Sequence, residues 1–191
     1  MIRSPPLTSP AARPLIDVDA PALRARFADA LAAANGIDAA HCIHESWMRG
    51  APPLQIEAAL ARLWDCAAAS VPAWLPMHYV PWLSLAYDVA GRFTAMRRGR
   101  HNVYLVSLDF GDRSPGRSGV YVGMTAHAPA QRFDQHRAGI RAAGSVMKRG
   151  RELLLGPVLH LQRIGRADAA RIERDLGSAL AAAGLVVEGG H

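Results

Sequence analysis

The sequence contains no long apolar run and few cysteines. Its longest apolar stretches, such as residues 80–86, are short and interrupted by proline, well below the ~20 residues that a membrane-spanning helix needs. The N-terminus lacks an apolar core followed by a small-residue cleavage site, which argues against a secretory signal. The two cysteines, Cys42 and Cys66, form no C-x-x-C pair, a pattern that favours reduced thiols over a disulfide framework. We therefore expect a soluble cytoplasmic protein with no membrane contact.

Only the second half of the chain has more basic than acidic residues. Residues 1–96 hold seven Arg and eight acidic residues, a balance of −1, whereas residues 97–191 hold fifteen Lys plus Arg and eight acidic residues, a balance of +7. A one-sided positive field suits a polyanion, because each phosphate that is neutralised releases condensed counterions. The charge favours nucleic acid as a partner of the second half over a merely solvated Arg-rich surface.

Local signals predict three regions. Residues 1–14 hold four prolines and few apolar anchors, so we expect residues 1–18 to form a disordered lead-in. Helical periodicity then predicts an all-α domain over residues 19–96. After the basic joint that begins at Arg97, the period becomes strand-like, which predicts a second domain over residues 102–191.

The predicted helical domain has four helices. Asp19 and Asp38 are expected to cap the first two, the third follows Pro52, and the fourth spans residues 81–93. The Pro-rich segment over residues 71–79 fits a packed loop, or a contact with a partner or a second copy, so a homodimer through this domain is one possibility. All the tryptophans lie in this half and are expected to build its core: Trp47, Trp64, Trp74 and Trp82.

The second domain is expected to be α+β. The prediction is a small three-stranded sheet, mixed or antiparallel, flanked by helices in the order β-β-α-β-α. Its elements are an antiparallel pair of strands over residues 103–108 and 119–125, a helix that begins at Pro129, a third strand over residues 157–162, a helix capped by Asp168 that ends before Gly184, and a short extended piece over residues 185–187.

Two tyrosine motifs in this domain precede a helix with charged residues. Tyr104 lies in Asn-Val-Tyr and Tyr121 opens Tyr-Val-Gly, whose Gly123 is expected to allow a close approach. Arg132 and His136 follow at i, i+4 spacing, which places them on one helix face. In this order the motifs resemble the GIY-YIG nuclease family, over residues 102 to about 187.

The resemblance implies a metal-dependent endonuclease that hydrolyses phosphodiester bonds, in DNA more than in RNA. A strand tyrosine, Tyr104 in preference to Tyr121, would deprotonate the attacking water, and Arg132 would hold the phosphate oxygens. His136 would orient a tyrosine hydroxyl, share the base role or contact a phosphate. Glu173 would bind one Mg²⁺ or Mn²⁺ ion. Asp175 would lie about 200° round the helix from Glu173 and cannot serve the same site.

Further basic residues are expected to contact nucleic acid: Arg137, Arg141, Lys148, Arg149 and Arg151. The sequence departs from the family in several places. Asn102 replaces the glycine of the first motif, and Met124 stands where many members have a lysine. The loop between the two tyrosines is longer than in compact members, and no asparagine follows Asn102.

Other functions remain open at this stage. The second domain could be a catalytically weak or inactive module that binds nucleic acid through the same fold, or the Trp-rich half could be a protein-interaction adaptor. Glu173 could instead form surface ion pairs with the neighbouring Arg171 and Arg174. Soft ligands in the helical half suggest zinc, but their spacing is unlike common zinc sites; they are His41, Cys42, His44 and Cys66.

Overall fold

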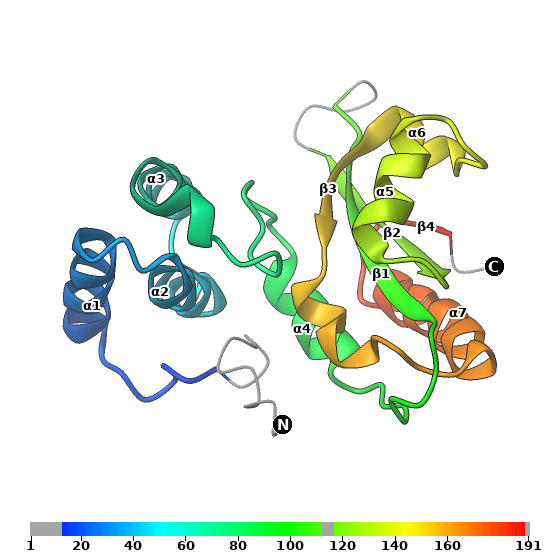
Figure 1. Cartoon of the computed structure of the whole chain (residues 1–191), viewed down its shortest axis with the longest axis horizontal. Helices are drawn as coiled ribbons and strands as arrows, with labels where there is room; N and C mark the ends of the chain where they lie inside the picture. The colour runs from blue at the N-terminus through cyan, green and yellow to red at the C-terminus, as the bar shows by residue number, and fades with distance from the viewer. Residues whose placement is uncertain (1–12, 112–116, 190–191) are drawn as a thin grey trace. The chain divides into compact units, whose positions relative to one another are not determined.

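The computed structural model describes residues 13–111 and 117–189 (Figure 1). The chain divides into two compact units, one up to Ser84 and one from Leu85 onward. This division precedes the predicted joint at Arg97, so the C-terminal unit takes in much of the helix that was expected to close the helical domain. Within the described ranges, no helix is both long enough and apolar enough to cross a bilayer.

Three helices form the first unit: α1 (Ala20–Ala32), α2 (Gly36–Met48) and α3 (Pro53–Ala67), followed by the 3-10 turn η2 (Ala68–Ser70). The Asp19 side chain accepts a hydrogen bond from the N–H of Ala22 at 2.7 Å, as the predicted cap of α1 requires. The cap predicted for α2 is wrong. The Asn35 side chain receives the N–H of Asp38 at 3.1 Å, and Asp38 lies within the first turn.

The core of this unit lies along α2. Helices α1 and α3 both pack against it, and Ile43 and Leu63 are among the side chains that they bury. Three of the tryptophans are buried, as predicted. Trp64 is not, because it lies on the outer face of α3 with 56% of its surface exposed.

The end of the predicted lead-in is packed. Residues 1–12 lie outside the described residues, but Leu15 is buried against Leu23 and Cys42. The Arg13 guanidinium donates two hydrogen bonds, at 3.1 and 2.8 Å, to the buried carboxylate of Glu45. The ordered chain therefore begins before Asp19.

Helix α4 (Leu83–Ala90) crosses the division between the units and is shorter than the predicted span of residues 81–93. Its end is held within the C-terminal unit by His160. The Nε2 atom of His160 lies 3.2 and 3.0 Å from the carbonyl oxygens of Ala90 and Phe93, so this nitrogen carries the hydrogen.

The C-terminal unit is α+β, as predicted, but its sheet has four strands among the described residues. They are β1 (Asn102–Asp109), β2 (Ser118–Thr125), β3 (Gly150–Leu154) and β4 (Val187–Gly189), in the order β3-β1-β2-β4. β1 pairs antiparallel with both β2 and β3, whereas β4 runs parallel to β2. The three-stranded prediction is wrong, because the third strand was placed on a segment that forms the 3-10 helix η3 (Gly156–Leu161) and the last extended piece joins the sheet.

Helices cover the sheet and carry the candidate residues. α5 (Pro129–Arg137) and α6 (Gly144–Arg149) lie over the face of β1 that carries Tyr104 and Val106, and they contribute Phe133 and Val146 to its apolar cluster. α7 (Arg166–Ala182) packs against β1, β2 and β4, and its buried residues lie outside that cluster. Figure 1 shows α5 in front of the sheet, and its closest strand contacts are with β1 and β3.

The ends of α7 match the prediction only at the C-terminus. Gly165, not Asp168, is the N-cap residue, and Asp168 lies in the first turn, where its negative charge favours the helix dipole. Gly184 follows the helix with a φ of +94°, a left-handed conformation in which glycine avoids strain.

Candidate active site in the sheet unit

The two motif tyrosines lie side by side on one face of the sheet. Tyr104 is opposite Gly123, and Tyr121 is opposite Val106. Partners across an antiparallel pair share a face, so both phenol rings project from the side covered by α5. Their ring centroids are 6.0 Å apart. Tyr104 is 1% exposed, whereas Tyr121 is partly exposed, so Tyr121 is the tyrosine that a substrate can reach.

Both tyrosine rings lie close to Gly123. A Cβ atom at this position would lie 2.6 Å from Cζ of Tyr104 and 2.7 Å from Cε1 of Tyr121, closer than van der Waals contact allows. Gly189 of β4 lies against the other side of the Tyr121 ring and has a φ of +79°. The close approach expected at Gly123 is thus made by the tyrosines themselves, and the second glycine was not predicted.

His136 is held as a neutral hydrogen-bond donor. The main-chain N–H of Ala143 donates to Nδ1 at 2.9 Å, so Nδ1 has no hydrogen. The neutral ring must then carry its hydrogen on Nε2, which lies 2.9 Å from the Tyr104 hydroxyl oxygen. Burial lowers the pKa of His136, and the charge of Arg132 lowers it further. Of the roles considered for His136, the geometry favours orienting a tyrosine hydroxyl.

Tyr104 and Tyr121 shift each other's pKa. Burial is the largest influence and raises the pKa of both phenols. The neighbouring Tyr121 raises the pKa of Tyr104 further, whereas Tyr104 lowers that of Tyr121. Because the Tyr104 oxygen accepts from His136, the Tyr104 proton is not used in that bond.

Arg132 sits beside both tyrosines and also fastens the loop after α5. Its Nη1 donates to the side chain of Gln135 and the carbonyl of Ile140, at 3.2 and 3.3 Å, and its Nη2 donates to the carbonyl of Arg141 at 2.8 Å. These bonds use three of the guanidinium's five donors. Its charge lowers the pKa of both Tyr104 and Tyr121. Arg132 therefore combines a structural task with a positive field at the site.

Glu173 reaches the same region from α7. Its Oε1 accepts the main-chain N–H of Met124 at 3.1 Å, one residue beyond Gly123, and its charge raises the pKa of Tyr121. No three His, Cys, Asp or Glu side chains form a metal-binding group in residues 13–111 and 117–189. A single carboxylate still fits Mg²⁺, which often takes one or two protein carboxylates and fills its other positions with water and substrate phosphate.

The predicted nucleic-acid residues lie in two places. Lys148, Arg149 and Arg151 line an open hollow of about 690 Å³ at the far end of β1, together with Asp109 and Gly111. The guanidinium of Arg149 lies 5.3 Å from the centre of the Phe110 ring, a cation–π contact.

The other two basic residues belong to α5 and the loop after it. The guanidinium of Arg137 lies 6.0 Å from the centre of the Phe133 ring, and both Arg137 and Arg141 are exposed. Arg141 also accepts the Arg132 hydrogen bond through its carbonyl, with a φ of +46°.

The soft ligands of the helical unit do not come together as a zinc site. Cys42 is buried whereas Cys66 is exposed, and the imidazoles of His41 and His44 lie against the Trp74 ring at centroid distances of 5.0 and 5.9 Å. Among the described residues these side chains form no metal-binding group of three. Aromatic packing accounts for both histidines.

Known proteins do not identify the chain. Comparison finds no matching family model, no matching curated sequence and no matching solved structure.

Proposed function

We propose that this chain is a metal-dependent endonuclease that hydrolyses phosphodiester bonds in nucleic acid, with DNA favoured over RNA, by a GIY-YIG-type mechanism. The observation that carries the proposal is the directed pair of hydrogen bonds from the Ala143 N–H through His136 to Tyr104, beside the accessible Tyr121 whose pKa Tyr104 lowers. A packed tyrosine does not need such a chain of donors. A phenol that must lose its proton does, because hydrogen bonds to the charged form favour it.

Each residue then has a defined task. Tyr121 takes a proton from the attacking water, which differs from the preference for Tyr104 that the sequence suggested. Tyr104 and His136 donate toward it, and the remaining donors of Arg132 bind non-bridging phosphate oxygens. A Mg²⁺ or Mn²⁺ ion held by Glu173 would supply positive charge for the leaving 3′ oxygen and offset the effect of this carboxylate on the Tyr121 pKa.

The basic hollow provides a place for more distant phosphates. Tyr121 pairs with Val106, and Asp109 lies three positions further along β1, a span of about 10 Å at the usual rise per strand residue. Successive phosphates of one DNA strand are spaced by about 3.4 Å along the helix axis. Lys148, Arg149 and Arg151 would therefore bind backbone about three nucleotides from the cleaved bond.

Cleavage of end-labelled duplex, branched and single-stranded DNA, and of matching RNA, tests the proposal with Mg²⁺, Mn²⁺ or chelator. Glu173→Gln can retain the hydrogen bond to the Met124 N–H while removing the charge, and we expect it to abolish cleavage. Asp175→Asn makes the same chemical change two residues away on α7 and should leave the rate near that of the natural chain. Cleavage that survives Glu173→Gln, or the absence of cleavage on every substrate, would overturn the proposal.

A second candidate is a module that binds nucleic acid without cutting it. Two observations favour it: Met124 stands where many members of the resembled family have a lysine, and three Arg132 donors are occupied by protein groups. This module would bind DNA in a salt-dependent way with an affinity that Glu173→Gln does not weaken, and it would show no turnover under any metal condition.

A further inference from the structure

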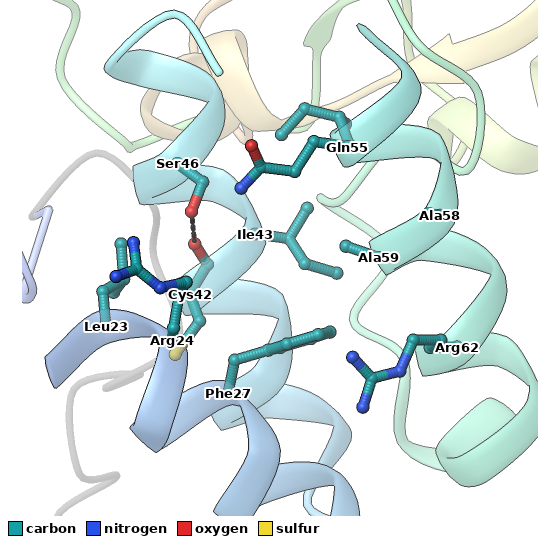
Figure 2. Close-up of a pocket in the computed structure, with 11 residues that line it drawn as sticks. Leu23, Arg24, Phe27, Cys42, Ile43, Ser46, Gln55, Ala58, Ala59 and Arg62 are labelled. Carbon is teal, nitrogen blue, oxygen red and sulfur yellow. Dashed lines mark hydrogen bonds between the residues drawn. The ribbon is translucent and has the colours of Figure 1, made fainter. Parts of the chain in front are cut away.

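The helical unit has a hollow of its own, lined by none of the residues of the candidate active site. It has a volume of about 270 Å³ and is bounded by α1, α2 and α3 (Figure 2). Ile43, Ile56 and Phe27 supply much of its apolar wall, and Ala58 and Ala59 leave room for it because their side chains are short. This volume is slightly below the ~300–1,000 Å³ typical of small-molecule pockets.

The two charged residues that line the hollow are both arginines. Figure 2 shows Arg24 on α1 and Arg62 on α3, on either side of the cavity, and no acidic residue is among those that line it. The other described arginines of this unit, Arg13, Arg26 and Arg49, are each ion-paired with a carboxylate. Arg24 and Arg62 form no ion pair within the described residues.

Contacts around the hollow hold one of these cations in place and keep the wall neutral. The Arg62 guanidinium lies 5.3 Å from the centre of the Phe27 ring, a cation–π contact that restrains it at the mouth. The Ser46 hydroxyl donates to the carbonyl of Cys42 at 2.9 Å, so its proton is already used. Burial raises the pKa of the Cys42 thiol to about 11, and the sulfur therefore adds no negative charge near neutral pH.

We propose that this hollow binds a small organic carboxylate with an apolar body, its tail against Phe27 and Ile43 and its carboxylate between Arg24 and Arg62. At roughly 30 Å³ per water-sized atom, the cavity holds about nine non-hydrogen atoms, the size of a medium-chain fatty acid. The N-terminal segment of the chain itself does not suit this site, because residues 1–12 include Arg3 and no acidic residue.

Titration calorimetry of the full chain with octanoate tests the inference. Three matched probes accompany it: octanol removes the charge, octylammonium reverses the charge, and acetate removes the apolar tail. We expect octanoate to bind at least tenfold more tightly than each of them. Arg24→Gln and Arg62→Gln should each weaken octanoate about two- to fivefold, as exposed charge pairs are worth up to ~1 kcal/mol, and Arg26→Gln, outside the hollow, should leave affinity unchanged.

Filling the hollow is the decisive control. Ala59→Leu should abolish octanoate binding, and Ala58→Leu, at an exposed helix position, provides a second test should the first variant fail to fold. Equal affinity for octanoate and octanol, binding that survives either leucine variant, or no binding of octanoate would overturn the proposal. So would a dimer in sedimentation that dissociates on Ala58→Leu, because the hollow would then be a contact between copies. None of these results depends on nucleic-acid cleavage.

Discussion

Replacing His136 by Gln or by Leu separates the role of hydrogen-bond donor from that of a base. The geometry requires a group that accepts from the Ala143 N–H and donates to the Tyr104 hydroxyl. A glutamine side chain offers one amide oxygen and one N–H₂ and can meet both demands, yet it cannot take up a proton. Leucine can meet neither.

The expected magnitudes follow from these two bonds. His136→Leu leaves a main-chain N–H and a tyrosine oxygen unsatisfied in a buried site, at about 1–3 kcal/mol each, so we expect the free energy of unfolding to fall by about 2–6 kcal/mol. Without His136 to orient it, Tyr104 would no longer donate to the developing Tyr121 phenolate, a loss of about 1.5–3 kcal/mol, or roughly 10- to 150-fold in rate. The pH–rate profile of this variant should move to higher pH, because the tyrosine pKa rises.

His136→Gln should retain cleavage within about tenfold of the natural chain, with little change in the pH–rate profile. Denaturant unfolding at 25 °C establishes that each variant is folded before its rate is measured. A Gln variant as inactive as a folded Leu variant would refute the donor assignment and indicate a base. ¹⁵N NMR of the imidazole gives a direct check, since a hydrogen on Nδ1 at pH 7.5 would contradict the tautomer inferred from the Ala143 contact.

Three further predictions concern the remaining structure. Gly123→Ala should lower the free energy of unfolding by about 1–3 kcal/mol, because the new methyl group meets two tyrosine rings. Gly144→Ala is the control, since open space surrounds Gly144 and the free energy of unfolding should change little. Equal losses for the two variants in denaturant unfolding would contradict the prediction. Burial lowers the pKa of His44 from 6.5 to about 4. The neutral imidazole therefore contributes fully to the free energy of unfolding above about pH 6.5, and we expect about 3 kcal/mol of that free energy to be lost as the pH falls toward 4. His44→Gln should remove this pH dependence, and calorimetric melting temperatures of the two proteins that fall in parallel with pH would count against it. Lys148→Gln and Arg151→Gln should each reduce the slope of log binding constant against log salt by about 0.9 on duplex DNA, a change that fluorescence anisotropy would show and whose absence would exclude a phosphate contact.

Local signals in the sequence were sufficient for several elements. The strands that carry Tyr104 and Tyr121 and the helix that begins at Pro129 formed as predicted, because a short apolar run or a proline at the first helical position marks each of them locally. The third strand was missed. Gly150–Leu154 contains two charged residues and becomes a strand by pairing with the edge of β1, while the apolar segment after Pro157 turns into a 3-10 helix.

The sequence by itself determined which chemical groups the site could contain: two tyrosines, Arg132, His136 and one suitable glutamate, in a half of the chain with a charge of +7. Only the tertiary structure decided their roles. The tautomer of His136 depends on the amide of Ala143, a main-chain group that any residue type carries and that no sequence pattern marks. The greater exposure of Tyr121 over Tyr104 depends on which ring α5 covers, a packing outcome that strand alternation alone does not specify.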